Sequence, residues 1–332
     1  MSEPAAQGTR LHVVSGKGGT GKTTVAAALA LAVASGGRNV LLCEVEGRQG
    51  IAQLFDVSPL PYEERKVAVA PDGGDVYALA IDAEEALLEY LQMYYKLGRA
   101  GRALDRFGVI DFATTIAPGL RDVLLTGKVY EAVTRSAAKR GRRYDAVVLD
   151  APPTGRLTRF LNVNREVAGL ARVGPVRSQA DSIMAMMRSP RTAVHLVTLL
   201  EDMPVQETVD SIAELSKADL PLGAVVVNQV RRTPLDAAAL STAADGGLPA
   251  QDLGAALRRA GLPDSEPVVA GLFTEARELA ERLALEEEQR SIVDGLALPS
   301  VELPLLADGV DLGGLYELAE EIVEQLLERE PG

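Results

Sequence analysis

The residues with the clearest chemistry lie near the N-terminus, in a run rich in glycine and lysine. Residues 16–23 read Gly-Lys-Gly-Gly-Thr-Gly-Lys-Thr and match every fixed position of a phosphate-binding loop. Glycines let backbone N–H groups turn around an anion, a lysine neutralises the β and γ phosphates, and a hydroxyl binds Mg²⁺. The sequence therefore predicts a site for ATP and Mg²⁺, in which Lys22 meets the phosphates and Thr23 the metal. The predicted nucleotide contacts are Gly16, Lys17, Gly18, Gly19, Thr20, Gly21, Lys22, Thr23 and Thr24.

A carboxylate follows a buried strand later in the chain. Residues 144–149 are mostly apolar, and Asp150 comes directly after them. In a phosphate-binding α/β fold, an acid at the carboxyl end of such a strand organises the magnesium ion. Asp150 is therefore predicted as the second magnesium-site residue beside Thr23.

A parallel sheet is needed to bring these groups together. Short apolar runs alternate with helical patterns, and residues 23–35 form an alanine-rich helix directly after the loop. Continuous apolar strands separated by helices are typical of a mostly parallel sheet covered on both faces, so we expect an α/β P-loop NTPase fold. The predicted strands are 11–14, 39–44, 76–81, 144–150, 193–199, 223–227 and 301–303.

Two stretches interrupt this alternation. Residues 84–142 have a helical pattern and predict a helical insertion, whereas 231–267 are rich in Ala, Asp, Gly and Pro and predict a surface excursion. We expect a disordered N-terminus over 1–9 and one ATPase domain over 10–330. Residues 315–326 have helical spacing with an acidic outer face, which predicts a helix that packs on the protein.

Composition narrows the class of protein. The formal net charge is −13 with a pI near 4.8, which argues against nucleic acid as a partner. A single cysteine, Cys43, excludes an internal disulfide framework. The N-terminus resembles no secretory signal and the longest apolar run, 25–34, is too short to span a bilayer, so we expect a cytoplasmic protein.

Lys17 and the segment after Asp150 carry a resemblance to a known family. A lysine directly after the first glycine is the signature of the deviant Walker A ATPases. Residues 150–161 resemble the Asp-Thr-Ala-Pro-Thr-Gly-His-Thr-Leu-Arg-Phe-Leu segment of the arsenite-pump ATPases, which the ATPases that target tail-anchored proteins share. The closest resemblance is to an actinobacterial paired-subunit branch, the anion-transporting-ATPase-like proteins.

The resemblance implies roles for further residues. Lys17 would act on the nucleotide of a partner subunit, in a homodimer or in a heterodimer with a related chain. Glu201 and Asn228 would contact the base or ribose, and Pro304, Leu305 and Leu306 would line the adenine pocket. Without the resemblance, Asn228 reads as a cap of a strand end and Glu201 as a solvated acid.

The chain departs from the family pattern at several positions. The family's switch I carries an aspartate that positions the attacking water, and this chain has Glu46 there. The extra methylene displaces the carboxylate, so we expect Lys17, Lys22 and Glu46 to support slow hydrolysis. The cysteines of the family's zinc clasp and of its arsenite site are missing, so neither site is expected.

The sequence leaves the biological output open. Met184, Met186 and Met187, together with apolar residues in 87–95, fit either a groove for a hydrophobic client or ordinary core. A lipid, protein or membrane partner is one reading. A second reading is a nucleotide-sensing carrier or scaffold with negligible hydrolysis, and a third, a chromosome-positioning ATPase, is disfavoured by the acidic pI.

Overall fold

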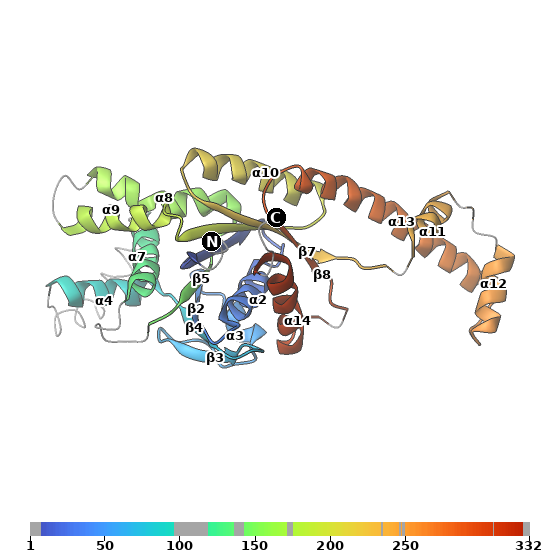
Figure 1. The fold of residues 1–332 in the computed structure, drawn as a ribbon, viewed down its shortest axis with the longest axis horizontal. Helices are drawn as coiled ribbons and strands as arrows, with labels where there is room; N and C mark the ends of the chain where they lie inside the picture. The colour runs from blue at the N-terminus through green and yellow to red at the C-terminus, as the bar shows by residue number, and fades with distance from the viewer. Residues whose placement is uncertain are drawn as a thin grey trace.

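One sheet runs through the centre of the computed structural model (Figure 1). The structure describes residues 8–95, 119–135, 143–170, 175–233, 235–245, 247, 250–307 and 309–327. Within them the sheet has eight strands in the order β3-β4-β2-β5-β1-β6-β7-β8. The strands are β1 (Leu11–Gly16), β2 (Asn39–Glu44), β3 (Arg65–Val69), β4 (Asp75–Ala80), β5 (Ala146–Asp150), β6 (Thr192–Thr198), β7 (Leu222–Val230) and β8 (Ser300–Pro304).

The sheet is parallel except at one edge, which confirms the predicted P-loop NTPase fold. Only β3 runs antiparallel among the described strands, and it pairs with β4. This edge strand was not predicted, because two of its five residues are the exposed Arg65 and Lys66 and its apolar run is only three residues long. Such charged, short strands are typical of sheet edges, where they discourage pairing with another chain.

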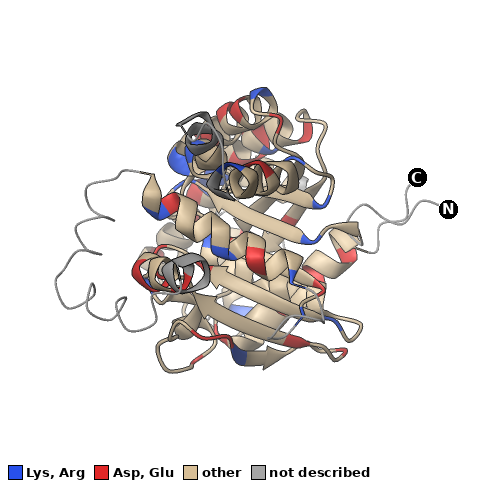
Figure 2. Cartoon of the chain, turned by 90° about the vertical axis from the view of Figure 1, so that its left-hand side faces the viewer, with Lys and Arg blue, Asp and Glu red and all other residues tan. Residues whose placement is uncertain are grey.

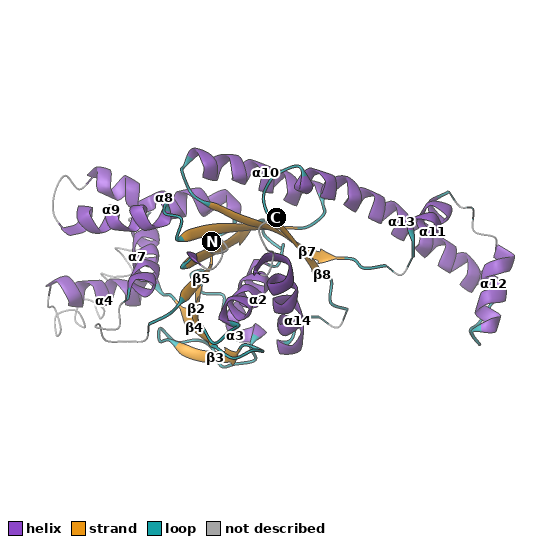
Figure 3. Ribbon diagram, in the orientation of Figure 1, coloured by secondary structure: helices purple, strands orange, loops and turns teal. Residues whose placement is uncertain are grey.

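Helices cover both faces of the sheet (Figure 3). On one face lie α2 (Lys22–Ala34), α3 (Gly50–Leu54) and α14 (Leu312–Ile322), which share a core with one side of the strands. On the other face lie α7 (Leu120–Thr134), α8 (Thr154–Leu170), α9 (Pro175–Met187) and α10 (Asp202–Lys217). The alternation of side chains along each strand supplies both cores, because neighbouring residues point to opposite faces.

The last helix packs as its spacing predicts. Leu315, Leu318, Ala319 and Ile322 are buried in the core that α14 shares with α2, and a short π-helical turn over Val323–Leu327 follows. None of the described helices is both long and apolar enough to cross a membrane.

The stretch expected to be a helical insertion contains α4 (Ala83–Tyr95) and α7. The buried face of α7 includes Leu125 and Val129, which join the core under β5. The rest of that insertion, 96–118 and 136–142, lies outside the described residues, as do residues 1–7 of the expected disordered N-terminus.

Beyond β7 the chain leaves the sheet. The stretch predicted as a surface excursion holds α11 (Ala237–Ala244) and α12 (Ala250–Arg259). It leads into α13 (Glu266–Asp294), a helix of 29 residues that carries this arm away from the sheet (Figure 1). At its C-terminal end α13 returns the chain to β8, and Val293 packs with β7.

Candidate nucleotide site

The glycine-rich loop lies at the carboxyl end of β1 and leads directly into α2. Gly16 ends the strand, and a Cβ there would lie 2.2 Å from the carbonyl oxygen of Val197. Gly21 precedes the helix with a φ of 84°, and a Cβ there would lie 2.3 Å from Asn228 Nδ2. Both positions therefore require glycine, because any side chain would collide with the neighbouring strands. Thr24 lies in the first turn of α2.

The hydroxyl of Thr23 and the carboxylate of Asp150 meet at the mouth of this loop. Thr23 Oγ1 donates a hydrogen bond to Asp150 Oδ2 at 2.7 Å, from elements 127 residues apart. β1 and β5 pair in register with Val14 opposite Asp150, so the two strand ends lie at one edge of the sheet. The sequence placed both residues in a magnesium site, and the fold brings them into contact.

The carboxylate of Asp150 lies in a buried environment that favours a bound cation. It is 8% exposed, and burial raises its pKa to about 6. The hydrogen bond from Thr23 and the charge of Lys22 act against that rise, while Glu44 and Glu46 add to it. A hydroxyl and a carboxylate fit Mg²⁺, which takes few protein ligands and completes its shell with phosphate oxygens and water.

Lys22 is held at the same place. Its ammonium donates to the carbonyl oxygen of Lys17 at 3.2 Å, within the loop itself. Burial lowers the pKa of Lys22, and the charges of Asp150 and Glu46 partly offset this. A half-buried ammonium next to a ring of backbone N–H groups fits the phosphates of a nucleotide.

Asn228 braces the loop from the neighbouring strand. Its side-chain Nδ2 donates to the carbonyl oxygen of Thr20 at 2.9 Å. The register of β7 against β8 shifts between Val227 and Val230, and Gln229 has a φ of 58°. A bulge of this kind re-aims a side chain, here from the strand toward the loop. The sequence analysis expected a contact with the base or ribose, which stays a prediction beside this observed contact.

The other residues assigned to the adenosine side lie at the same edge of the sheet. Glu201 is exposed and precedes α10. Pro304 ends β8, and the N–H of Leu305 donates to the carbonyl oxygen of Val230 at 2.9 Å. Leu305 is 46% exposed, whereas Leu306 packs against the core under α2. Their contacts with adenosine remain predictions.

Lys17 has a partner within its own chain. Its ammonium lies 3.0 Å from Glu207 Oε1 on α10, and Glu207 Oε2 accepts a hydrogen bond of 3.3 Å from Thr154. No role was predicted for Glu207, because no sequence pattern indicates that α10 lies over the loop. Only the folded chain brings the two together.

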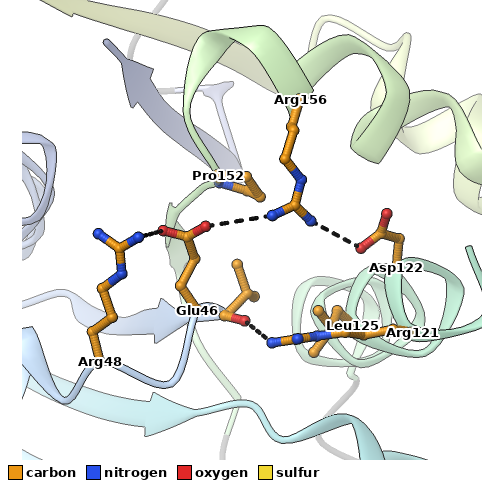
Figure 4. A pocket seen from close by; sticks show the side chains of 8 residues that line it. Glu46, Arg48, Arg121, Asp122, Leu125, Pro152 and Arg156 are labelled. Atoms are coloured by element: carbon orange, nitrogen blue, oxygen red, sulfur yellow. Dashed lines mark hydrogen bonds and ion pairs between the residues drawn. The ribbon is translucent and has the colours of Figure 1, made fainter. Parts of the chain in front are cut away.

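Glu46 lies after β2, on the wall of a cavity of about 200 Å³ (Figure 4). Its carboxylate faces two guanidinium groups: Oε2 is 3.5 Å from Arg48, and Oε1 is 3.7 Å from Arg156. The sequence analysis missed Arg156, although it stands where the quoted family segment has histidine. It also missed Glu44, a buried acid paired in register with Asp150.

The methionine cluster belongs to the core. Met184, Met186 and Met187 are all buried, and the last two pack in the core on the α8 face of the sheet. They therefore do not line an open groove. In the other apolar segment Leu87 and Leu88 are half-buried, and the side chains of residues 90–95 lie outside the described part of the chain.

Several known ATPases are similar to this chain in sequence. The chain is 55% identical to the ATPase BagA of Mycobacterium tuberculosis over 320 residues. This alignment covers 96% of this chain and 94% of that protein. It is 25% identical to the ATPase GET3 of Kluyveromyces lactis, over 65% of this chain and 71% of that protein. It is 28% identical to an arsenical pump-driving ATPase of Escherichia coli, over 68% of this chain and 36% of that protein.

The family match covers the part of the chain that holds the glycine-rich loop and Asp150. The sequence model of the anion-transporting ATPase family matches residues 9–189, which include the glycine-rich loop, Glu46, Asp150 and Arg156. With this match and the phosphate-binding loop at the carboxyl edge of a parallel sheet, the chain belongs to the anion-transporting ATPase family.

Proposed function

We propose that this protein binds MgATP and hydrolyses it slowly, as a dimeric switch. The observation that carries the proposal is the 2.7 Å hydrogen bond from Thr23 to the buried Asp150, beside a loop whose glycines leave room for phosphates. Lys22 supplies the counter-charge to the β and γ phosphates, and Mg²⁺, when bound at Thr23 and Asp150, neutralises the charge that develops during phosphoryl transfer. Neither an arsenite site nor a zinc site is part of the proposal.

Slow turnover follows from the position of Glu46. Its two carboxylate oxygens face Arg48 and Arg156, so turning toward the γ-phosphate separates two ion pairs. The same observation supports a second function, a nucleotide-sensing carrier or scaffold that hydrolyses ATP negligibly. Steady-state phosphate release by the purified protein separates the two, because only the first requires turnover that depends on Mg²⁺.

We infer a dimer from Lys17, whose family signature implies an action on a partner's nucleotide. The partner is a second copy or a related chain, with a hydrophobic client or a membrane partner in addition. We further propose a cytoplasmic location. We expect no nucleic-acid partner, in keeping with the net charge of −13.

Replacement of Lys22 tests the site. Lys22→Ala removes the main positive charge facing the phosphates, so ATP affinity should fall by at least tenfold, about 1.4 kcal/mol. Fluorescent-nucleotide titration measures this, with Lys217→Ala, an exposed lysine in the last turn of α10, as the matched control. ATP affinity within threefold of the parent protein in Lys22→Ala would overturn the site assignment.

A further inference from the structure

The cavity beside Glu46 joins three parts of the chain (Figure 4). Val45, Glu46 and Arg48 come from the loop after β2, and Pro152 and Arg156 come from the turn into α8 that follows Asp150. The third part is the start of α7, in the stretch expected to be a helical insertion, with Arg121, Asp122 and Leu125. Two of the parts adjoin the candidate magnesium and phosphate site, and the third does not.

One side chain spans all three. Arg156 Nη1 lies 3.7 Å from Glu46 Oε1, and Arg156 Nη2 lies 3.9 Å from Asp122 Oδ1. The side chains of Glu46 and Asp122 are 21% and 15% exposed, whereas the Arg156 side chain is 60% exposed. The two carboxylates therefore share Arg156, and Glu46 also faces Arg48.

The rigid shape of arginine links the positions of the two carboxylates. A guanidinium is planar and rigid, so its two Nη groups move together. Both distances exceed those of a hydrogen bond, and exposed ion pairs of this kind stabilise a fold little. Arg156 is thus free to shift toward one acid or the other without a large cost in folding stability.

We propose that Arg156 is a positioning residue that restrains Glu46 and couples its release to helix α7 through Asp122. While Arg156 faces Glu46, the carboxylate is directed into the cavity. When α7 moves Asp122 toward Arg156, Glu46 is freed to orient the attacking water. This inference rests on the proposed function, in which Glu46 serves hydrolysis.

Substitutions at the two ends of the link should act in opposite directions. Arg156→Gln removes one of the two guanidinium groups that face Glu46, with Arg48 remaining, and should raise kcat about two- to fivefold, with the KM for ATP within twofold. Asp122→Asn removes the competitor, leaves Arg156 to Glu46, and should lower kcat by a similar factor. The double variant should behave as Arg156→Gln does, because Asp122 acts only through Arg156. Arg159→Gln, an exposed arginine one turn along α8, is the matched control.

A second measurement follows α7 without relying on turnover. Hydrogen–deuterium exchange over residues 120–134 should change when MgADP is added to the parent protein, and Arg156→Gln should abolish that change. Unchanged kcat in both single variants, or the same MgADP response in Arg156→Gln as in the parent, would overturn the inference. Failure of the proposed function looks different: Lys22→Ala would then bind nucleotide normally.

Discussion

At the scale of single residues, the candidate site is a set of charges that lie close to one another at the carboxyl edge of the sheet. Asp150 is buried without a full counter-charge, and burial raises its pKa to about 6. Lys17 is paired with Glu207, and Glu46 with two arginines. Lys17 and Glu46 are therefore each held by contacts other than the ones that their proposed roles require.

Glu46 gives the sharpest residue-scale prediction. Glu46→Gln keeps the size of the side chain but removes the base, so turnover should fall by roughly 100-fold with ATP affinity preserved. Glu46→Asp shortens the reach to that of the family's aspartate and should leave turnover unchanged or raise it. Phosphate release and nucleotide titration on the same samples measure both. An unchanged rate in Glu46→Gln would mean that the water is positioned by another group.

At the scale of elements, β1 carries both the phosphate loop and a buried histidine pair. His12 of β1 stacks on His195 of β6 with ring centroids 5.3 Å apart, and His12 Nδ1 lies 3.1 Å from His195 Nε2. Ala224 N–H donates to His195 Nδ1, so the bridging proton is on His195 Nε2. A Cβ on Gly223 would lie 2.7 Å from the His195 ring, which explains glycine in β7.

This pair should make the sheet sensitive to acid. Burial lowers the pKa of His195 to about 4 and that of His12 well below its usual range. Since an unfolded histidine titrates near pH 6.5, at these two positions only the unfolded chain gains protons as the pH falls below that value. The contribution of the pair to the free energy of unfolding should therefore drop between about pH 6.5 and pH 4, by up to about 3 kcal/mol for His195.

Urea unfolding at pH 7 and pH 5 measures the effect. The double variant His12→Leu, His195→Gln retains an acceptor for Ala224 N–H but no imidazole. It should lose less stability than the parent between the two pH values, whatever its stability at pH 7. An equal loss in both proteins would show that other groups cause the acid sensitivity.

At the scale of the whole molecule, the charge is acidic in total but mixed in distribution. Lysine and arginine lie among aspartate and glutamate over the helices seen in Figure 2. The arm of α11, α12 and α13 extends away from the sheet on the side opposite α4 and α9 (Figure 1). The question at this scale is whether one chain completes its own site or needs a second chain.

An experiment that mixes two variant subunits tests this for the proposed dimer. Lys17→Ala protomers bind ATP but lack the signature lysine, and Lys22→Ala protomers have that lysine but a damaged loop. If Lys17 acts on a partner's nucleotide, each variant alone should be inactive, while an exchanged mixture should recover up to about a quarter of the parent rate. The lysine must first leave Glu207, from which it is 3.0 Å away.

The control is a mixture of Lys17→Ala with the double variant Lys17→Ala, Lys22→Ala, which contains no Lys17 and should stay inactive. Native mass analysis verifies that subunits have exchanged. No recovery in an exchanged mixture of the two single variants would assign Lys17 to its own nucleotide.

The sequence by itself determined the parallel sheet, and it predicted the glycine-rich loop and Asp150 as parts of one site. These follow from local patterns: glycines spaced around a lysine and a hydroxyl, an acid directly after an apolar strand, and apolar runs long enough for a covered sheet. The folded chain adds why Gly16 and Gly21 must be glycine, because Val197 of β6 and Asn228 of β7 leave no room for a side chain.

Only the tertiary structure decided which charged groups meet. Lys17 and Glu207 are 190 residues apart, and Arg156 reaches Glu46 and Asp122 from a third element. The histidine pair and the edge strand β3 were not predicted either, the first because it needs β1 beside β6 and the second because its apolar run is only three residues long. Such contacts depend on strand order and helix approach, which no local spacing encodes.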